Sequence, residues 1–107
     1  ILLLESDENV RKLKGENRPV FTQRERAEVL SALSPVDFVI LLPLMTSDAD
    51  YNHIITTIKP HIIAVTEHDP LMKEKEKQAK RVGGKIAIIP FVKTFSSSKL
   101  AKLLGID

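Results

Sequence analysis

Residues 1–15 read ILLLESDENVRKLKG, and this stretch decides the class of fold. A short apolar run is followed at once by a polar turn and then by a segment with helical spacing. We expect a strand over Ile1–Leu4 and a helix over Glu8–Lys14 that follows a cap at Asp7. Because the chain opens inside an apolar run without an initiator Met, we expect this strand to have further sequence upstream.

Three further apolar runs repeat this beginning along the chain: Phe38–Leu42, Ile62–Val65 and Ile86–Ile89. Each run is a continuous apolar block rather than an in-and-out alternation. Such blocks are typical of strands that are buried on both faces of a parallel sheet.

Helical signals separate the runs. Thr22 and Glu25 form a T-x-x-E capping box, and Pro35 closes the helix that follows. Further helices are predicted over 47–59, where Ser47 is the cap, over 70–82, and from Ser96 onward. The apolar side chains expected to face inward from the helices are Ala27, Leu30, Leu33, Tyr51, Ile54, Ile55, Ile58, Leu100, Leu103 and Leu104.

This alternation of strands and helices predicts an α/β fold with a parallel sheet covered by helices on both faces. The length of 107 residues fits a single domain, 1–107. The formal net charge is only +2, and the positive residues are interleaved with acidic ones, which argues against a nucleic-acid partner. There is no Cys and no apolar run long enough for a membrane span, and we expect a cytoplasmic protein without a membrane partner.

Candidate chemistry lies after the strands, because ligands of open parallel sheets bind beyond the carboxyl ends of the strands. Ser96, Ser97 and Ser98 stand at the start of the last predicted helix, where unpaired backbone N–H groups favour phosphate. The simpler interpretation is that one of these serines caps the helix.

A second candidate is the basic stretch Arg11–Gly15, which Arg18 and Pro19 follow. A Lys beside a Gly near the binding edge of a sheet can reach a phosphate, although a basic surface loop would read the same way. The turn Thr66–Asp69 contains His68 between two carboxylates, which is only weak evidence for a metal site.

Several motifs, taken in order, resemble the cytidylyltransferase-like nucleotidyltransferases, in particular the adenylyltransferase domain of bacterial ADP-heptose synthases. In that branch the pattern S-D-x-x-V-x-x-L-K-G-x-x-R-P-V follows the second strand, and residues 6–20 match it. The rest of the match runs in order over nearly the whole chain: Glu25–Leu33, Val36-Asp37, Lys59-Pro60, Gly83–Lys85 and Ser96–Ser98.

The resemblance implies a Rossmann-like sheet with strand order 3-2-1-4-5. It implies transfer of a nucleotidyl group from ATP or CTP to a phosphorylated sugar or polyol, with Mg²⁺ and release of pyrophosphate. Relatives are often dimers, so a homodimer is also implied. The resemblance implies that Lys14 is a catalytic residue that contacts the phosphates. It implies nucleotide binding by Ser96, Ser97, Ser98 and Asp69, and structural support by Asp7, Arg26 and Asp37.

The sequence departs from the family in two places. The family signature H-x-G-H is absent from these residues, and its natural place is upstream of Ile1 on the central strand of the sheet. The turn Thr66–Asp69 stands where the family has a glycine-rich turn, and only Asp69 matches it. We therefore expect about thirty further N-terminal residues, or a strand from another chain, to fill the sheet centre and cover two apolar strand edges.

Two other interpretations stay open. The first is a non-catalytic nucleotide-binding or regulatory module on the same fold. The second is a flavodoxin-like or response-regulator-like domain, for which Glu5 and Asp7 give a faint indication.

Overall fold

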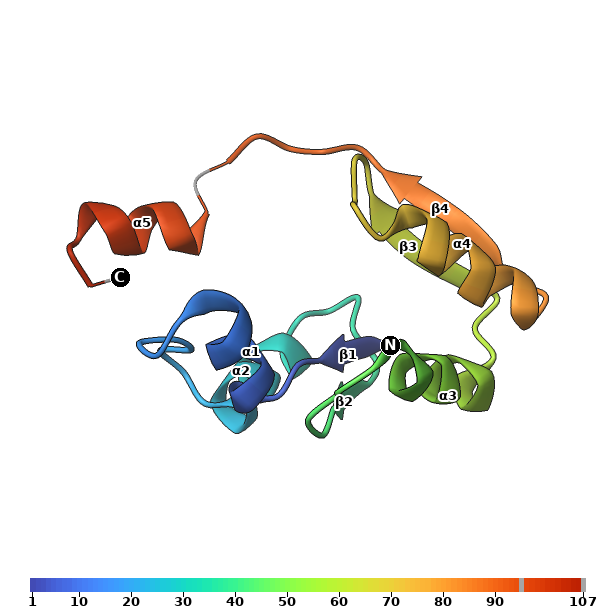
Figure 1. The fold of residues 1–107 in the computed structure, drawn as a ribbon, viewed down its shortest axis with the longest axis horizontal. Helices are drawn as coiled ribbons and strands as arrows, with labels where there is room; N and C mark the ends of the chain where they lie inside the picture. Colours follow the sequence, from blue (N-terminus) through green and yellow to red (C-terminus); the bar gives the residue numbers. More distant parts are fainter. Residues whose placement is uncertain (95, 107) are drawn as a thin grey trace. The chain divides into compact units, whose positions relative to one another are not determined.

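A computed structural model describes residues 1–94 and 96–106 of the chain. Strands and helices follow one another as the sequence predicts (Figure 1). Their bounds are β1 (Leu2–Leu4), α1 (Asp7–Lys14), α2 (Gln23–Ser31), β2 (Val39–Leu41), α3 (Asp48–Ile58), β3 (Ile62–Thr66), α4 (Met72–Arg81), β4 (Lys85–Ile89) and α5 (Ser97–Leu103). Each predicted strand and helix is confirmed, with bounds that shift by one to three residues.

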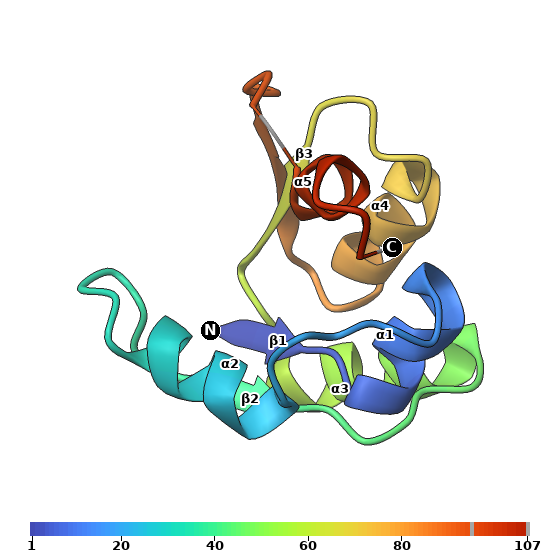
Figure 2. The same ribbon diagram turned by 90° about the vertical axis from the view of Figure 1, so that its left-hand side faces the viewer.

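The chain forms two compact units. The first unit contains residues 1–45 together with 96–106, and the second contains residues 46–94. In the first unit, β1 and β2 pair in parallel, with Leu3 opposite Ile40. The pairing continues past the strand ends, because Leu42 N donates to Leu4 O at 2.9 Å. Helix α2 packs beside β2 (Figure 2).

The second unit is a β-α-β arrangement. Strands β3 and β4 pair in parallel along their whole length, from Ile62 opposite Lys85 to Thr66 opposite Ile89. Helix α4 connects them and packs against both strands, and α3 packs against α4. The α4–β4 connection contains Gly83-Gly84, so the predicted stop after the helix is confirmed.

The predicted parallel pairing is confirmed, but the strands form two two-stranded sheets, β1-β2 and β3-β4. The expectation that each strand is buried on both faces is wrong. Exposed fractions reach 61% at Ile62, 57% at Ile88 and 46% at Leu41. Successive side chains of a strand point to opposite faces, and within each unit a two-stranded sheet has too little covering structure to bury both of them.

Helix caps agree with the sequence signals except at α1. The predicted cap at Asp7 is wrong: Ser6 is the cap, and its Oγ accepts from Asn9 N at 3.1 Å. Asp7 is instead the first helical residue, where a carboxylate interacts favourably with the positive end of the helix dipole. The predicted box at α2 is confirmed, since Thr22 N donates to Glu25 Oε2 at 2.9 Å and Glu25 N donates to Thr22 Oγ1 at 3.2 Å.

The inward face of α5 also differs from the prediction. Leu100, Leu103 and Leu104 are 52%, 73% and 64% exposed, whereas Ala101 is only 5% exposed. Ala101 is thus the buried side chain of this helix, and Leu100 and Leu104 line a cavity that is described below. None of the helices in the described ranges is long and apolar enough to span a bilayer.

Candidate functional site

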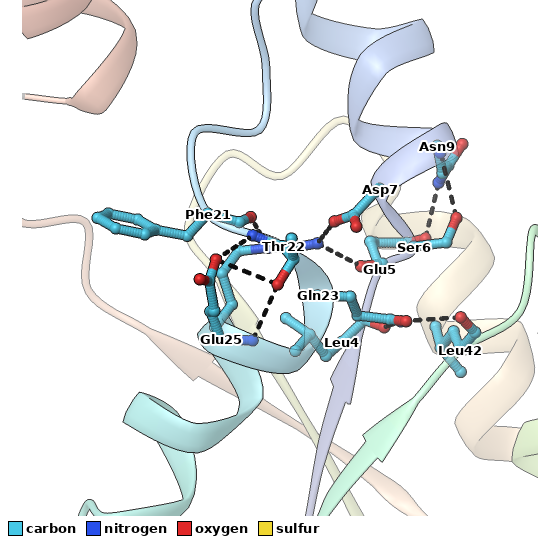
Figure 3. A network of polar contacts seen from close by, with 11 residues as sticks. Leu4, Glu5, Ser6, Asp7, Asn9, Phe21, Thr22, Gln23, Glu25 and Leu42 are labelled. Carbon is cyan, nitrogen blue, oxygen red and sulfur yellow. Dashed lines mark hydrogen bonds and ion pairs between the residues drawn. The ribbon is translucent and has the colours of Figure 1, made fainter.

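The start of α2 is fixed at the carboxyl ends of β1 and β2 (Figure 3). Gln23 Nε2 donates to Leu4 O and to Leu42 O, at 2.9 Å in each case. Leu4 is the last paired residue of β1 and Leu42 follows the last paired residue of β2, so one side-chain amide binds the carbonyls at the ends of both strands. The contact holds the 15–22 loop and the first turn of α2 beside the strand ends, where parallel sheets bind ligands.

An ion pair joins the same region to α1. Arg26 Nη2 donates to Asp7 Oδ1 at 2.8 Å and to Glu5 O at 3.0 Å, while Arg26 Nε donates to Phe21 O at 3.1 Å. One guanidinium thus ties the first turn of α1 to the loop and to α2. The family resemblance assigns Asp7 and Arg26 to structural support, and the ion pair between them is consistent with that assignment.

The Arg26 hydrogen bond holds the pKa of Asp7 below its ordinary value of 3.8. A carboxylate whose folded-state pKa is depressed contributes stability that is fully present above its unfolded pKa and lost as the pH falls through the folded one. We therefore expect the difference in melting temperature between wild type and Asp7→Asn to be largest near neutral pH and to shrink as the pH falls below the ordinary pKa of 3.8. Thermal unfolding of the full-length protein over a pH series measures this, with Glu76→Gln as the charge-matched control. A difference that stays constant across the series would contradict the assignment.

A cavity of about 400 Å³ lies within the first unit, between α1, the loop 15–22 and α5. Most of its lining is apolar, and four lining residues carry polar or charged groups. The lining residues are Val10, Lys14, Arg18, Pro19, Val20, Phe21, Arg26, Ser97, Leu100, Ala101, Leu104 and Ile106. Among the described residues no Asp or Glu belongs to this lining, and its charged side chains are cationic: Lys14, Arg18 and Arg26.

The three cationic residues of the cavity differ in their surroundings. Arg26 is neutralised by Asp7, as described above. Lys14 is exposed at the end of α1, and no described carboxylate lies within ion-pair distance of it. Arg18 is only 8% exposed, and its Nη1 is buried without a hydrogen-bond partner among the described residues. Sequence reasoning placed Arg18 in a basic stretch but gave it no role, since burial of one Arg is not visible in a local pattern.

The structure brings together some of the residues assigned from the sequence. Lys14 and Ser97 line the same cavity, although they come from opposite ends of the chain. Ser96 is the cap of α5, and its Oγ accepts from Lys99 N at 3.2 Å, in agreement with the capping interpretation. Ser98 is half-buried and does not belong to the cavity lining.

The other assigned residues lie apart from this cavity. Asp37 is exposed in the segment before β2. Asp69 belongs to the second unit, where its Oδ1 accepts from Leu71 N at 2.7 Å and its Oδ2 from Lys75 Nζ at 2.6 Å. The bond from Lys75 lowers the pKa of Asp69. Both carboxylate oxygens of Asp69 therefore have partners, one at the cap of α4 and one within the helix.

The turn before Asp69 has a backbone conformation that favours glycine. His68 has φ 62°, in the left-handed region, and Asp69 N donates to Thr66 O at 3.2 Å to close the turn. This accounts physically for the glycine-rich turn that the family resemblance implies at this place. The three titratable side chains of the turn do not form a metal site, since the described residues contain no group of three or more His, Cys, Asp or Glu placed to hold a metal ion.

His68→Gly is expected to stabilise the protein by about 0.5–1 kcal/mol, because glycine adopts positive φ without the steric cost of a Cβ. Thermal unfolding measures the change. The matched control is His61→Gly, at a residue whose φ is outside the left-handed region and where we expect a loss of stability. Equal losses for the two variants would show that the turn conformation is not as described.

Comparison with known proteins finds bifunctional HldE proteins among the relatives of the chain. No protein-family model matches the chain, and no solved structure matches it at a significant level. The bifunctional protein HldE of Pelobacter propionicus is 33% identical over 101 residues, which is 94% of this chain and 20% of that protein. The HldE proteins of Nitrobacter hamburgensis and Nitrobacter winogradskyi are each 36% identical, over 95% and 98% of this chain.

The chain spans about a fifth of the length of these relatives. The matched region covers almost the whole chain rather than one motif, as the ordered set of short matches in the sequence predicts. The resemblance to bacterial ADP-heptose synthases is therefore confirmed: over nearly its whole length, this chain is related to one segment of the bifunctional HldE proteins.

Proposed function

We propose that this chain is the greater part of a nucleotidyltransferase domain, which transfers a nucleotidyl group from ATP or CTP to a phosphorylated sugar or polyol. The observation that carries the proposal is the shared cavity of Lys14 and Ser97. The family resemblance implies that both residues bind the triphosphate, although they are far apart in the sequence. A common cavity is what a joint role in binding one polyanion requires.

The reaction needs no covalent intermediate on the protein. An oxygen of the acceptor phosphate attacks the α-phosphorus in line. The bond between the α-phosphorus and the oxygen that bridges it to the β-phosphorus breaks, and pyrophosphate leaves with the electron pair. The protein contributes position and positive potential. In this chain the Lys14 ammonium would stabilise charge that develops on the leaving pyrophosphate, and the Ser97 hydroxyl would donate to a phosphate oxygen.

Mg²⁺ is part of this proposal because the family uses it with the triphosphate. The cavity lining contains no carboxylate among the described residues, so these side chains do not form a magnesium site of their own. A Mg²⁺ ion that enters with the nucleotide would be held by phosphate oxygens and water, as is common for this ion. The steps assigned here to Lys14 and Ser97 do not depend on it.

The proposal also includes a strand that these residues do not supply. The family order 3-2-1-4-5 places one strand between the pair that corresponds to β1-β2 and the pair that corresponds to β3-β4. That strand leads into the H-x-G-H motif in the family. We propose that the full-length protein, or a second chain, provides it, and that the two small sheets are then parts of one Rossmann-like sheet.

A second candidate function is nucleotide binding without catalysis. It is favoured by the turn Thr66–Asp69, where His68 stands in place of the glycine-rich turn and both oxygens of Asp69 accept hydrogen bonds, from Leu71 N and Lys75 Nζ. The upstream sequence discriminates between the candidates, because an intact H-x-G-H motif is needed for transfer but not for binding.

A pyrophosphate-release screen of the full-length protein tests the proposal. It crosses ATP and CTP with phosphorylated sugars and polyols in the presence of Mg²⁺. We expect at least one pair to release pyrophosphate in proportion to acceptor consumed. Nucleotide binding without pyrophosphate release in any substrate pair would favour the second candidate function. The absence of both nucleotide binding and pyrophosphate release would overturn both candidate functions.

A further inference from the structure

The most unusual charged group of the first unit is the guanidinium of Arg18. The residue is 8% exposed, and its Nη1 is buried without a partner among the described residues. Its backbone is well placed, since Arg18 N donates to Gly15 O at 3.1 Å. The side chain is buried, and it carries a positive charge there because arginine stays protonated in proteins.

An unpaired buried charge is costly. Removing a guanidinium from water without a compensating partner destabilises a fold, and replacing it by an apolar group of similar volume is often neutral or stabilising. None of the ion pairs found among the described residues involves Arg18. Asp7 is paired with Arg26 at 2.8 Å, and Glu16 lies 3.9 Å from Arg11. Packing alone thus gives no reason for an arginine at position 18.

The location of Arg18 supplies a reason. It lines the cavity of about 400 Å³ together with Lys14 and Ser97, and none of the described residues of that lining is an Asp or a Glu. A guanidinium offers a planar fork of N–H donors that matches two oxygens of a phosphate group. Lys14 adds a point charge at the exposed side of the same cavity. These donors fit an anion with several oxygens better than any neutral ligand.

We propose that Arg18 binds a phosphate group of the ligand of this cavity, with Nη1 as one donor. The identity of the ligand rests on the proposed function, whereas the binding of a phosphate by Arg18 does not. The phosphate can come from the nucleoside triphosphate or from the phosphorylated acceptor, and both present the same oxygens to the guanidinium.

The test measures ligand-dependent stabilisation and affinity in the full-length protein. The probes are inorganic pyrophosphate, tripolyphosphate and ATP in one arm, and a sugar monophosphate in the other. The variants are Arg18→Met, which keeps the volume and removes the charge, and Arg18→Lys, which keeps the charge and removes the planar fork. Arg24→Met is the control, at an exposed arginine of α2 outside the cavity lining.

We expect Arg18→Met to melt at the same or a higher temperature than wild type without ligand, and to bind at least one probe about tenfold more weakly or worse. The arm in which affinity falls identifies the source of the phosphate. Arg18→Lys should bind that probe with intermediate affinity, and Arg24→Met should bind it like wild type. For a residue that supports structure alone, the opposite pattern is expected: a lower melting temperature without ligand and unchanged affinity, which would overturn the inference.

If Arg18→Met does not fold, Arg18→Lys decides: unchanged affinity for every probe overturns the inference. The proposed function fails separately. Phosphate binding that depends on Arg18, without pyrophosphate release in any substrate pair, would remove only the proposed transfer reaction. Transfer with an unchanged KM for both substrates in Arg18→Met would remove only the role of Arg18.

Discussion

Lys14→Met in the full-length protein is expected to lower kcat/KM for nucleotidyl transfer about a hundredfold or more, while the protein stays folded. Lys14 is exposed at the end of α1 and lines the cavity without a carboxylate partner among the described residues. Its removal therefore costs little stability. Loss of one donor aimed at charge that develops in a transition state costs about 3 kcal/mol, which corresponds to this change in rate.

The control for this variant is Lys12→Met. Lys12 is an exposed lysine of the same helix and does not belong to the cavity lining. Initial rates of pyrophosphate release, measured over a range of nucleotide and acceptor concentrations, separate effects on kcat from effects on KM. A decrease in kcat indicates that Lys14 acts mainly in the transition state. A change of less than threefold in kcat/KM, or an equal loss in Lys12→Met, would contradict the assignment.

Gly84→Ala is expected to destabilise the protein by about 2–3 kcal/mol. A Cβ at Gly84 would lie 2.5 Å from Pro60 O and 3.1 Å from His61 O, and both of these atoms belong to the backbone. The surrounding segment cannot move freely, because Gly84 N donates to Ala79 O and Lys85 N donates to His61 O, each at 2.8 Å. The added methyl group must therefore push β4 away from the start of β3.

Denaturant unfolding of the second unit within the full-length protein measures this loss. Gly83→Ala is the matched control, because a Cβ at Gly83 would meet nothing within 4 Å, although its φ of 74° favours glycine. We expect the control to lose about 1–2 kcal/mol through backbone strain alone. A loss in Gly84→Ala no larger than that in Gly83→Ala would mean that α4, β3 and β4 pack differently.

The features that the sequence predicts well are local ones. The capping box of Thr22 and Glu25 and the stop at Gly83-Gly84 depend on residues within a few positions of each other, and both are confirmed. The parallel pairing of β1 with β2 and of β3 with β4 follows from the alternation of strands and helices. The cap of α1 was misplaced by one residue because Ser6 and Asp7 are both good caps, and only the backbone conformation distinguishes them.

The features that the sequence does not predict depend on distant contacts. Helical spacing points to the leucines of α5 as its inward face, but Ala101 is the buried side chain of this helix. The burial of Arg18 likewise depends on where the 15–22 loop and α5 meet. The common cavity of Lys14 and Ser97 was expected from the family resemblance rather than from spacing, because the two residues share no local pattern.

The position of a bound nucleotide tests the central claim most directly. The measurement is a crystal structure of the full-length protein with a non-hydrolysable nucleoside triphosphate. Our account predicts phosphate oxygens within about 3.2 Å of Lys14 Nζ and of Ser97 Oγ, inside the cavity of the first unit. A triphosphate bound elsewhere, with both of these groups more than about 4 Å from any phosphate oxygen, would contradict it.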